Sequence, residues 1–296
     1  MKRFLIPAAF ATLASSAPLA FAQDAPVQTT PAQVAPPAED GWDVFRDPNR
    51  SMLMAYADFG SGLGVAVRCV GHSYEAVITG LPAVRTRTRP IGLLFSTHDQ
   101  GAQRWNVAQD GTVAASSFPA PFARALRQGG QLHVVLPDAA EGGRDLRYVL
   151  DLPSSGALVD ETLSACGLPT SDPRDALIPE LGANGLPPGL VWRERPRALF
   201  FPERDRQRLH TRGFSVLTCM AGANGRLSDC KVESEYPSGS GFGEAALSGV
   251  DTARLGAAAR GAPVEPGLIS FRMEFELDGF GGTQRSGGLP HADTPN

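Results

Sequence analysis

The segment that decides the fold is GFSVLTCMAGANGRLSDCKVESE, residues 213–235, which combines a hairpin signal with half of the cysteines. Asn224-Gly225 stands between two runs that contain apolar residues, and this dipeptide favours a two-residue type I′ turn. A hairpin closed by that turn places Cys219 opposite Cys230. Directly opposed Cα atoms lie about 4.5–5.5 Å apart, which is within the range of a disulfide. The sequence therefore predicts a Cys219–Cys230 bond.

The other two cysteines are Cys69 and Cys166, so the chain carries an even number. In an oxidising compartment, an even set of this kind forms disulfides more often than metal sites or nucleophiles. Because the hairpin accounts for one pair, we expect Cys69 to bond to Cys166.

The first residues indicate export. Lys2 and Arg3 precede an apolar stretch, and Ala20-Phe21-Ala22 forms a small-x-small cleavage site. We expect a signal peptide over residues 1–22, cleavage after Ala22 and a location in the periplasm. The alternative is an uncleaved membrane anchor, because Phe4–Ala22 is just long enough to span a bilayer.

The composition is that of an ordinary globular protein, with 42% hydrophobic and 20% charged residues. The 33 Gly and 25 Pro predict long loops and turns rather than helical bundles, and they exclude a coiled coil. A net charge of -4 argues against nucleic acid as a partner, because such binders rely on a basic surface.

Changes in composition divide the chain into segments. A Pro/Ala-rich linker, 23–41, leads into a domain at 42–167 in which predicted strands outnumber helices. We expect this domain to be a sandwich or barrel-like, with short helices near FARALRQGG and near Val159 to Ala165. A Pro/Gly-rich linker, 168–195, follows it, and then come a second domain at 196–278 and a disordered tail at 279–296.

The second domain mixes helices and strands. Pro202 suits the first position of a helix that ends near Gly213. In ISFRMEFEL, residues 269–277, apolar and polar residues alternate with a period of two, which predicts a strand buried on one face. Together the two domains predict an α+β fold class.

Residues 196–277 resemble the C-terminal domain of the TonB family of periplasmic energy transducers. Phe201-Pro202-Glu203-Arg204 lies in the register of that family's YPERA-type first helix, and the hairpin AGANGRLSDCKV follows it. Glu235-Tyr236-Pro237 and GSGFGEAAL resemble the approach to the second helix, and Gly261-Ala262-Pro263-Val264 precedes the closing strand. The resemblance covers about 80 residues, roughly a quarter of the chain.

The resemblance implies two helices packed on a three-stranded antiparallel sheet. It also implies a function, because this domain of the family accepts an extended receptor segment, the TonB box, along a sheet edge. The expected peptide-binding edge strand contains Ile269, Phe271, Met273 and Phe275. We therefore expect a non-enzymatic module with protein or peptide partners such as outer-membrane receptor segments. The alternative is an anchored energy transducer, which contacts the membrane through an uncleaved N-terminus.

Catalytic chemistry has little support in the sequence. His72 is next to Ser73, but neighbouring strand residues point to opposite faces, so His72 is badly placed as a base for Ser73. The five histidines form no HExxH motif, and we expect no metal, no cofactor and no catalytic residue. A cell-envelope enzyme or ligand-binding protein acting through the N-terminal domain is the second alternative.

Arginine clusters form a further candidate site. Arg85, Arg87 and Arg89 alternate with threonines, so on a strand their side chains share one face and form an anion patch. The competing interpretation is a solvated edge strand.

Overall fold

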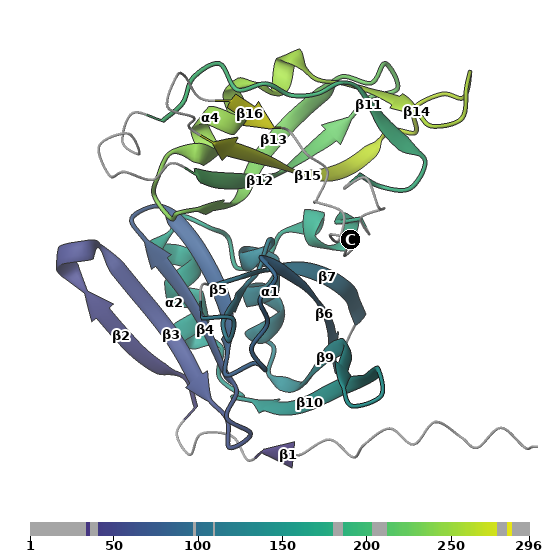
Figure 1. Cartoon of the computed structure of the whole chain (residues 1–296). Coiled ribbons are helices and arrows are strands. Elements are labelled where there is room, and N and C mark those ends of the chain that lie inside the picture. Colours follow the sequence, from purple (N-terminus) through teal and green to yellow (C-terminus); the bar gives the residue numbers. More distant parts are fainter. Residues whose placement is uncertain are drawn as a thin grey trace, which may run out of the picture.

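The computed structural model describes residues 34–35, 41–96, 99–108, 110–179, 186–202, 212–276 and 283–285. The described residues form two large hydrophobic cores, one built from residues between Trp42 and Leu163 and one from residues between Leu186 and Phe275. We call residues 41–179 the N-terminal part and residues 186–276 the C-terminal part. Figure 1 shows the C-terminal part stacked on one end of the N-terminal part.

A single ten-stranded sheet, in the order β1-β10-β9-β6-β7-β8-β5-β4-β3-β2, dominates the N-terminal part. Its strands are β1 (Val34–Ala35), β2 (Asp43–Asp47), β3 (Met52–Asp58), β4 (Gly64–Val70), β5 (Ser73–Thr79), β6 (Thr88–Phe95), β7 (Asp99–Val107), β8 (Ala114–Ala115), β9 (Gly130–Ala140) and β10 (Arg144–Leu152). All neighbours pair antiparallel except β1, which pairs parallel with β10.

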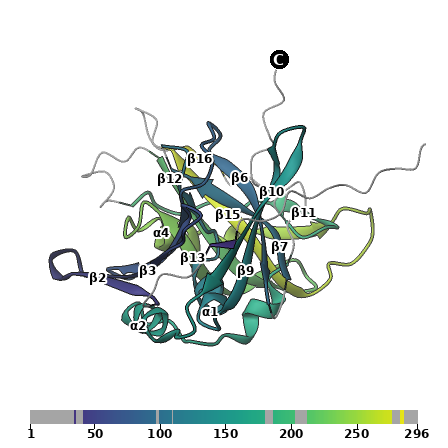
Figure 2. The ribbon, with the colours of Figure 1, turned by 90° about the horizontal axis from the view of Figure 1, so that it is seen from below.

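The sheet curves around helix α1 (Pro119–Leu126), as Figures 1 and 2 show. All eight residues of α1 are buried, which fits its Ala- and Pro-rich sequence and explains why it lacks a polar face. Phe122 packs edge-to-face on Trp105 of β7 at 5.2 Å between ring centroids. The expected barrel-like architecture is therefore a curled sheet that is filled by a helix.

Helix α2 (Ala157–Ala165) covers β3 and β4 on the side of the molecule where β2 lies (Figure 2). Two bonds attach it to the sheet. Cys166 at its C-terminal end forms a disulfide with Cys69 of β4, with a Cα–Cα distance of 5.5 Å. The hydroxyls of Thr162 and Tyr74, both buried, lie 2.8 Å apart in a hydrogen bond. The disulfide is the pairing expected from the sequence.

The C-terminal part contains an antiparallel sheet in the order β13-β12-β15-β16. Its strands are β12 (Arg212–Ala221), β13 (Leu227–Tyr236), β15 (Gly267–Glu276) and the short β16 (Thr283–Arg285). Helix α4 (Phe242–Ser248) packs on β12 and β13, and β11 (Leu190–Glu194) and β14 (Arg254–Ala257) form a separate two-stranded sheet. Three short 3-10 helices complete the described elements: η1 (Pro48–Arg50), η2 (Pro173–Leu177) and η3 (Val250–Thr252).

The hairpin between β12 and β13 differs from the prediction in its turn but keeps its disulfide. Gly222 and Gly225 bracket the turn, and the N–H of Gly225 donates to the Gly222 carbonyl at 2.8 Å. With three residues in the loop, the register near the turn moves by one residue from the expected one. A bulge at Asp229, whose φ is 48°, restores the expected register farther from the turn. Cys219 therefore still meets Cys230, at a Cα–Cα distance of 4.1 Å.

The expected linkers contain regular structure. Strand β11 lies inside the predicted linker 168–195, where Leu190 belongs to the second core, and η2 lies there too. Strand β1 lies inside the predicted linker 23–41. These segments were predicted as linkers from Pro and Gly content alone, but their few apolar residues are buried or paired by distant parts of the chain.

The expected signal peptide and the expected helix after Pro202 lie outside the described residues. Within the described part, no helix combines the length and apolar content needed to cross a bilayer.

Candidate interaction site between the two parts

Strand β15 has an edge that no described strand covers over most of its length, and we call this its free edge. Its other edge pairs with β12 from Gly267 to Glu276. On the free side, β16 pairs only with residues 274–276, and no other described strand pairs with Gly267–Met273. Among the described residues, the main-chain N–H and C=O groups on this side of the stretch therefore have no strand partner, and a further strand could bind them.

Strand β7 in the N-terminal part has a comparable edge. It pairs with β6 along its length, but β8 covers its other side only at Asn106 and Val107. No described strand pairs with the remaining residues of that side. The Ser117 hydroxyl donates to the carbonyl of Arg104 at 3.1 Å, so this carbonyl points away from β6.

These two edges border the same cavity. It has a volume of about 910 Å³, and its lining includes Asp99–Arg104 of β7 and Ser270–Arg272 of β15. Side chains of consecutive strand residues point to opposite faces, so a run of consecutive lining residues indicates that each strand turns its edge to the cavity. The rest of the lining comes from α1 with the residues on either side of it, from the segment 170–179, from Pro90 of β6 and from Val216 of β12.

The arginine of β15 links the two parts at this cavity. Arg272 stacks over the ring of Phe214, 3.6 Å from the ring centroid, and donates to the side-chain oxygen of Asn106 on β7. Its Nε lies 3.2 Å from a carboxylate oxygen of Glu274. Burial lowers the pKa of Arg272 to about 10, although Glu274 acts against this shift, and the nearby charges of Arg104 and Arg87 lower it further.

A buried serine lies beside this arginine. Ser270 is two residues before Arg272, so both side chains lie on the face of the sheet that is turned toward the N-terminal part. Ser270 is fully buried, and its hydroxyl has no hydrogen-bond partner among the described residues. A buried hydroxyl without a partner costs free energy, and it is a donor that a bound segment can satisfy.

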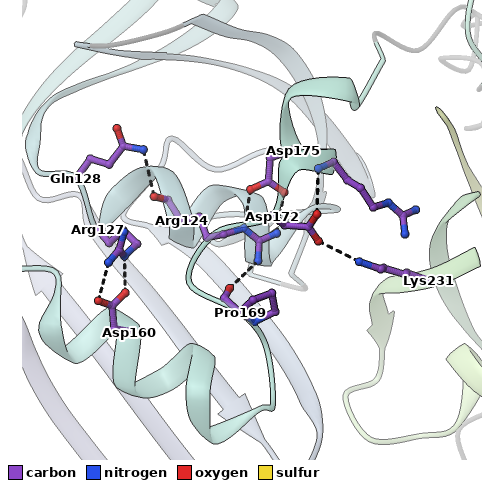
Figure 3. A network of polar contacts seen from close by, with 9 residues as sticks. Arg124, Arg127, Gln128, Asp160, Pro169, Asp172, Asp175 and Lys231 are labelled. Atoms are coloured by element: carbon purple, nitrogen blue, oxygen red, sulfur yellow. Dashed lines mark hydrogen bonds and ion pairs between the residues drawn. The ribbon is translucent and has the colours of Figure 1, made fainter. Parts of the chain in front are cut away.

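Another wall of the cavity is formed by α1 and the segment 169–178. Ion pairs hold this segment against α1 (Figure 3). The Arg124 guanidinium donates to both carboxylate oxygens of Asp175 at 2.5 and 2.7 Å and to the carbonyl of Pro169 at 3.2 Å. Arg127 forms a second two-pronged pair with Asp160 of α2. Planar, two-pronged pairs of this kind fix geometry well, so this wall of the cavity is rigid.

The same segment also contacts the C-terminal sheet. Lys231 of β13 donates to Asp172 at 3.0 Å, and Arg174 donates to the hydroxyl of Thr218 at 2.8 Å. Partial burial acts to raise the pKa of Asp172, but the hydrogen bonds from the Arg174 N–H and from Lys231 hold it below its ordinary value. Glu233 accepts from the Thr218 hydroxyl at 2.5 Å, and burial raises its pKa.

The four apolar residues of the predicted edge strand lie on the buried face of β15, as the alternation of apolar and polar residues predicts. Ile269, Phe271, Met273 and Phe275 are all buried in the second core. Their side chains therefore pack in that core, and of the four only Phe271 also lines the cavity. At Phe275 the main chain already pairs with β16, which shortens the free edge relative to the prediction.

The predicted anion patch does not form. Arg85 and Arg87 are exposed in a bend that precedes β6, whereas Arg89 lies within β6 and is buried. Arg89 points inward in phase with Ile91, and its guanidinium donates to the carbonyl of Pro82 at 2.8 Å. The alternation argument was wrong here because the strand begins only at Thr88.

His72 and Ser73 are also separated. His72 is exposed in the two-residue turn that joins β4 to β5, and Ser73 is the buried first residue of β5. Gly71 occupies the first turn position with φ 64°, as a type II′ hairpin requires.

The sequence did not single out Arg104, Ser270 or Arg272. The two residues of β15 stand at polar positions of an alternating strand, which predicts a solvent-facing side. That side is instead covered by Phe118, which packs with Phe214 and Val216. Such a contact joins residues far apart in the chain, and no local pattern signals it.

Comparisons with known proteins give limited information. No family model matches the chain, and no curated protein matches it. Among solved structures, the solution NMR structure of the Pseudomonas aeruginosa TonB CTD is similar at 14% sequence identity. The similar region covers 31% of this chain and 87% of that one, with a TM-score of 0.24.

Proposed function

We propose that this chain is a non-enzymatic periplasmic protein that binds an extended segment of a partner protein along the free edge of β15. The observation that supports the proposal most strongly is the unpaired main chain of Gly267–Met273, which opens into a cavity instead of being covered by another described strand. A strand added there gains main-chain hydrogen bonds on one side and contacts with the N-terminal part on the other.

The free edge of β15 differs from the outer edge of the N-terminal sheet. Strand β2 also ends a sheet, but Asp43, Arg46 and Asp47 place charges at three of its five positions. Charged residues of this kind protect an edge against pairing. The free part of β15, by contrast, carries a single charge, Arg272. We infer that β15 is the edge that binds.

The resemblance of residues 196–277 to TonB C-terminal domains makes outer-membrane receptor segments the first partner class to test. The probes are synthetic peptides of about ten residues: one with alternating Val and Thr, one with a TonB-box sequence, and a copy of each that is N-methylated at every second amide. The methylated copies keep the side chains but lose main-chain donors. We expect micromolar binding of the unmethylated peptides by fluorescence anisotropy and a loss of at least about tenfold on methylation.

A blocking variant locates the site. Ala102 is an exposed residue of β7 that lines the cavity, so Ala102→Trp fills the space beside β15. Ala139→Trp is the matched control, because Ala139 is an exposed strand residue of β9 outside the lining. We expect peptide binding to be lost in the first variant only. Equal binding by both variants, or no binding of any peptide to the unaltered chain, would contradict the proposal.

A further inference from the structure

The cavity beside β15 carries unbalanced positive charge at one end. Arg104 and Asn106 are two residues apart on β7, so their side chains lie on the same face of that strand. Because Asn106 accepts a hydrogen bond from Arg272, this arrangement brings Arg104 close to Arg272. Both arginines line the cavity.

Among the described residues, only one of these two arginines has an acidic partner. Glu274 pairs with Arg272, and the structure shows no acidic partner for Arg104 among the described residues. Within the described part of the chain, Arg104 donates to the hydroxyl of Thr88, at 3.3 Å. The direction of the Arg272 pKa shift agrees with this geometry, because burial and the repulsion from Arg104 and Arg87 together outweigh the attraction of Glu274.

The buried Ser270 hydroxyl also indicates that a bound acceptor belongs at this end of the cavity. It faces the side of the sheet that carries Arg272, and it has no partner among the described residues. A hydroxyl that lacks a hydrogen-bond partner and a guanidinium that lacks an acidic partner, such as that of Arg104, can both donate to an oxygen acceptor that carries negative charge. In a strand paired with β15, the residue opposite Ser270 or Arg272 presents its side chain on this face.

We propose that the segment bound along β15 carries an acidic side chain, Asp or Glu, that docks between Arg104 of β7 and Arg272 of β15 with Ser270 as a further donor. This inference rests on the proposed function, and it gives the N-terminal part a role, because Arg104 lets that part select which segments bind. The carboxylate is held as a charge-assisted pair beside the buried Ser270, where such pairs contribute more than on an open surface.

The chain's own C-terminus is a weaker occupant of this position. The residues that follow β16 in the sequence are Ser286-Gly287-Gly288-Leu289-Pro290. Two Gly and a Pro are unfavourable in a strand, and none of these residues carries a negative charge. A partner segment with an acidic residue satisfies the arginines, whereas this stretch does not.

The test uses the full chain and matched peptides. In a Val/Thr peptide of about ten residues, one residue is replaced by Glu or by Gln at each position in turn, and affinities are measured by fluorescence anisotropy. For at least one position, we expect the Glu peptide to bind about tenfold more tightly than its Gln counterpart, which corresponds to about 1.4 kcal/mol. Arg104→Gln should reduce this preference, measured as the ratio of the two affinities for the same variant, to about twofold or less, and Arg104→Lys should restore part of it.

Arg147→Gln is the control for general loss of charge, because Arg147 is exposed on β10 and outside the cavity lining. It should behave like the unaltered chain. Equal binding of Glu and Gln peptides at every position, or an Arg104→Gln variant that keeps the full preference, overturns the inference while leaving strand binding intact. If no peptide of the set binds, the proposed function itself fails.

Discussion

Arg272 shows how one residue connects the two parts of the molecule. Its guanidinium stacks on Phe214 of the neighbouring strand and donates to Asn106 of the other sheet. In sequence it is the polar member of an alternating strand, and there it predicts contact with solvent. Packing between distant segments changes that role, so the polar face of β15 lines a cavity instead of the surface.

Gly213 tests the packing of the second core. A Cβ built on Gly213 would overlap the Phe242 ring of α4, whereas a Cβ on Gly267 meets nothing within 4 Å. Gly213→Ala should therefore lower the free energy of unfolding by about 1–3 kcal/mol. Gly267→Ala, the control, should leave it nearly unchanged. Urea unfolding measures both values, and equal effects of the two substitutions would contradict the packing described.

Glu233 gives a prediction about pH. Because burial raises the pKa of Glu233, the folded chain keeps this proton at pH values where the unfolded chain has lost it. The free energy of unfolding therefore falls as the pH rises from the ordinary carboxyl pKa through the raised one. Glu233→Gln lacks this dependence and keeps an acceptor for the Thr218 hydroxyl.

The Glu233→Gln variant should consequently gain stability relative to the unaltered chain as the pH rises from about 4 to about 8. Urea unfolding of both proteins at the two pH values tests this. A stability difference that is the same at both, or larger in acid, would show that the charged form of Glu233 is not disfavoured in the folded state.

Strand β16 is the element that limits the free edge. It occupies Glu274–Glu276, so a partner segment that extends past Met273 must displace it. A chain that ends at Glu276 should bind the Val/Thr peptide several-fold more tightly. A chain that ends at Arg285 keeps β16 and should behave like the full chain. Weaker binding by the shorter chain would instead mean that β16 contributes to the site.

The disulfides differ in how much chain they close. Cys69–Cys166 spans 97 positions and attaches α2 to the sheet, whereas Cys219–Cys230 spans 11 within one hairpin. In the chain-entropy model, loops of these sizes contribute about 5 and about 3 kcal/mol. Replacing Cys69 and Cys166 with Ser should therefore destabilise more than replacing the hairpin pair. Thermal unfolding compares the two double variants, and the reverse order would refute this account.

The elements that depend on local sequence were predictable. The helix at Val159–Ala165, the closing strand and the Cys219–Cys230 pair follow from periodicity and a turn signal, although the turn has one more residue than expected. The burial of Arg89 and the strand β11 could not be predicted in this way. The burial of Arg89 depends on where β6 begins, and β11 depends on its pairing with β14. The cavity depends on contacts between residues of both parts, such as Arg272 with Asn106, and sequence patterns do not report them.

At the scale of the whole molecule, the N-terminal part covers one face of the C-terminal sheet and α4 packs on the other. The hydroxyl of Ser234 on β13 donates to the carbonyl of Ser117 at 3.0 Å, and Phe118 packs against Val216. Among the described strands, none pairs with the outer side of Gly267–Met273 in this arrangement. Under the proposed function, the N-terminal part shapes the binding site, and we expect selective binding to require both parts.

Amide hydrogen exchange tests the central claim most directly, because it reports main-chain hydrogen bonding residue by residue. The full chain is compared with and without the Val/Thr peptide, and the N-methylated copy serves as control. We predict that amides within Leu268–Met273 become more protected only with the unmethylated peptide. Bound peptide with unchanged exchange across these residues would contradict the claim that partners pair with the edge of β15.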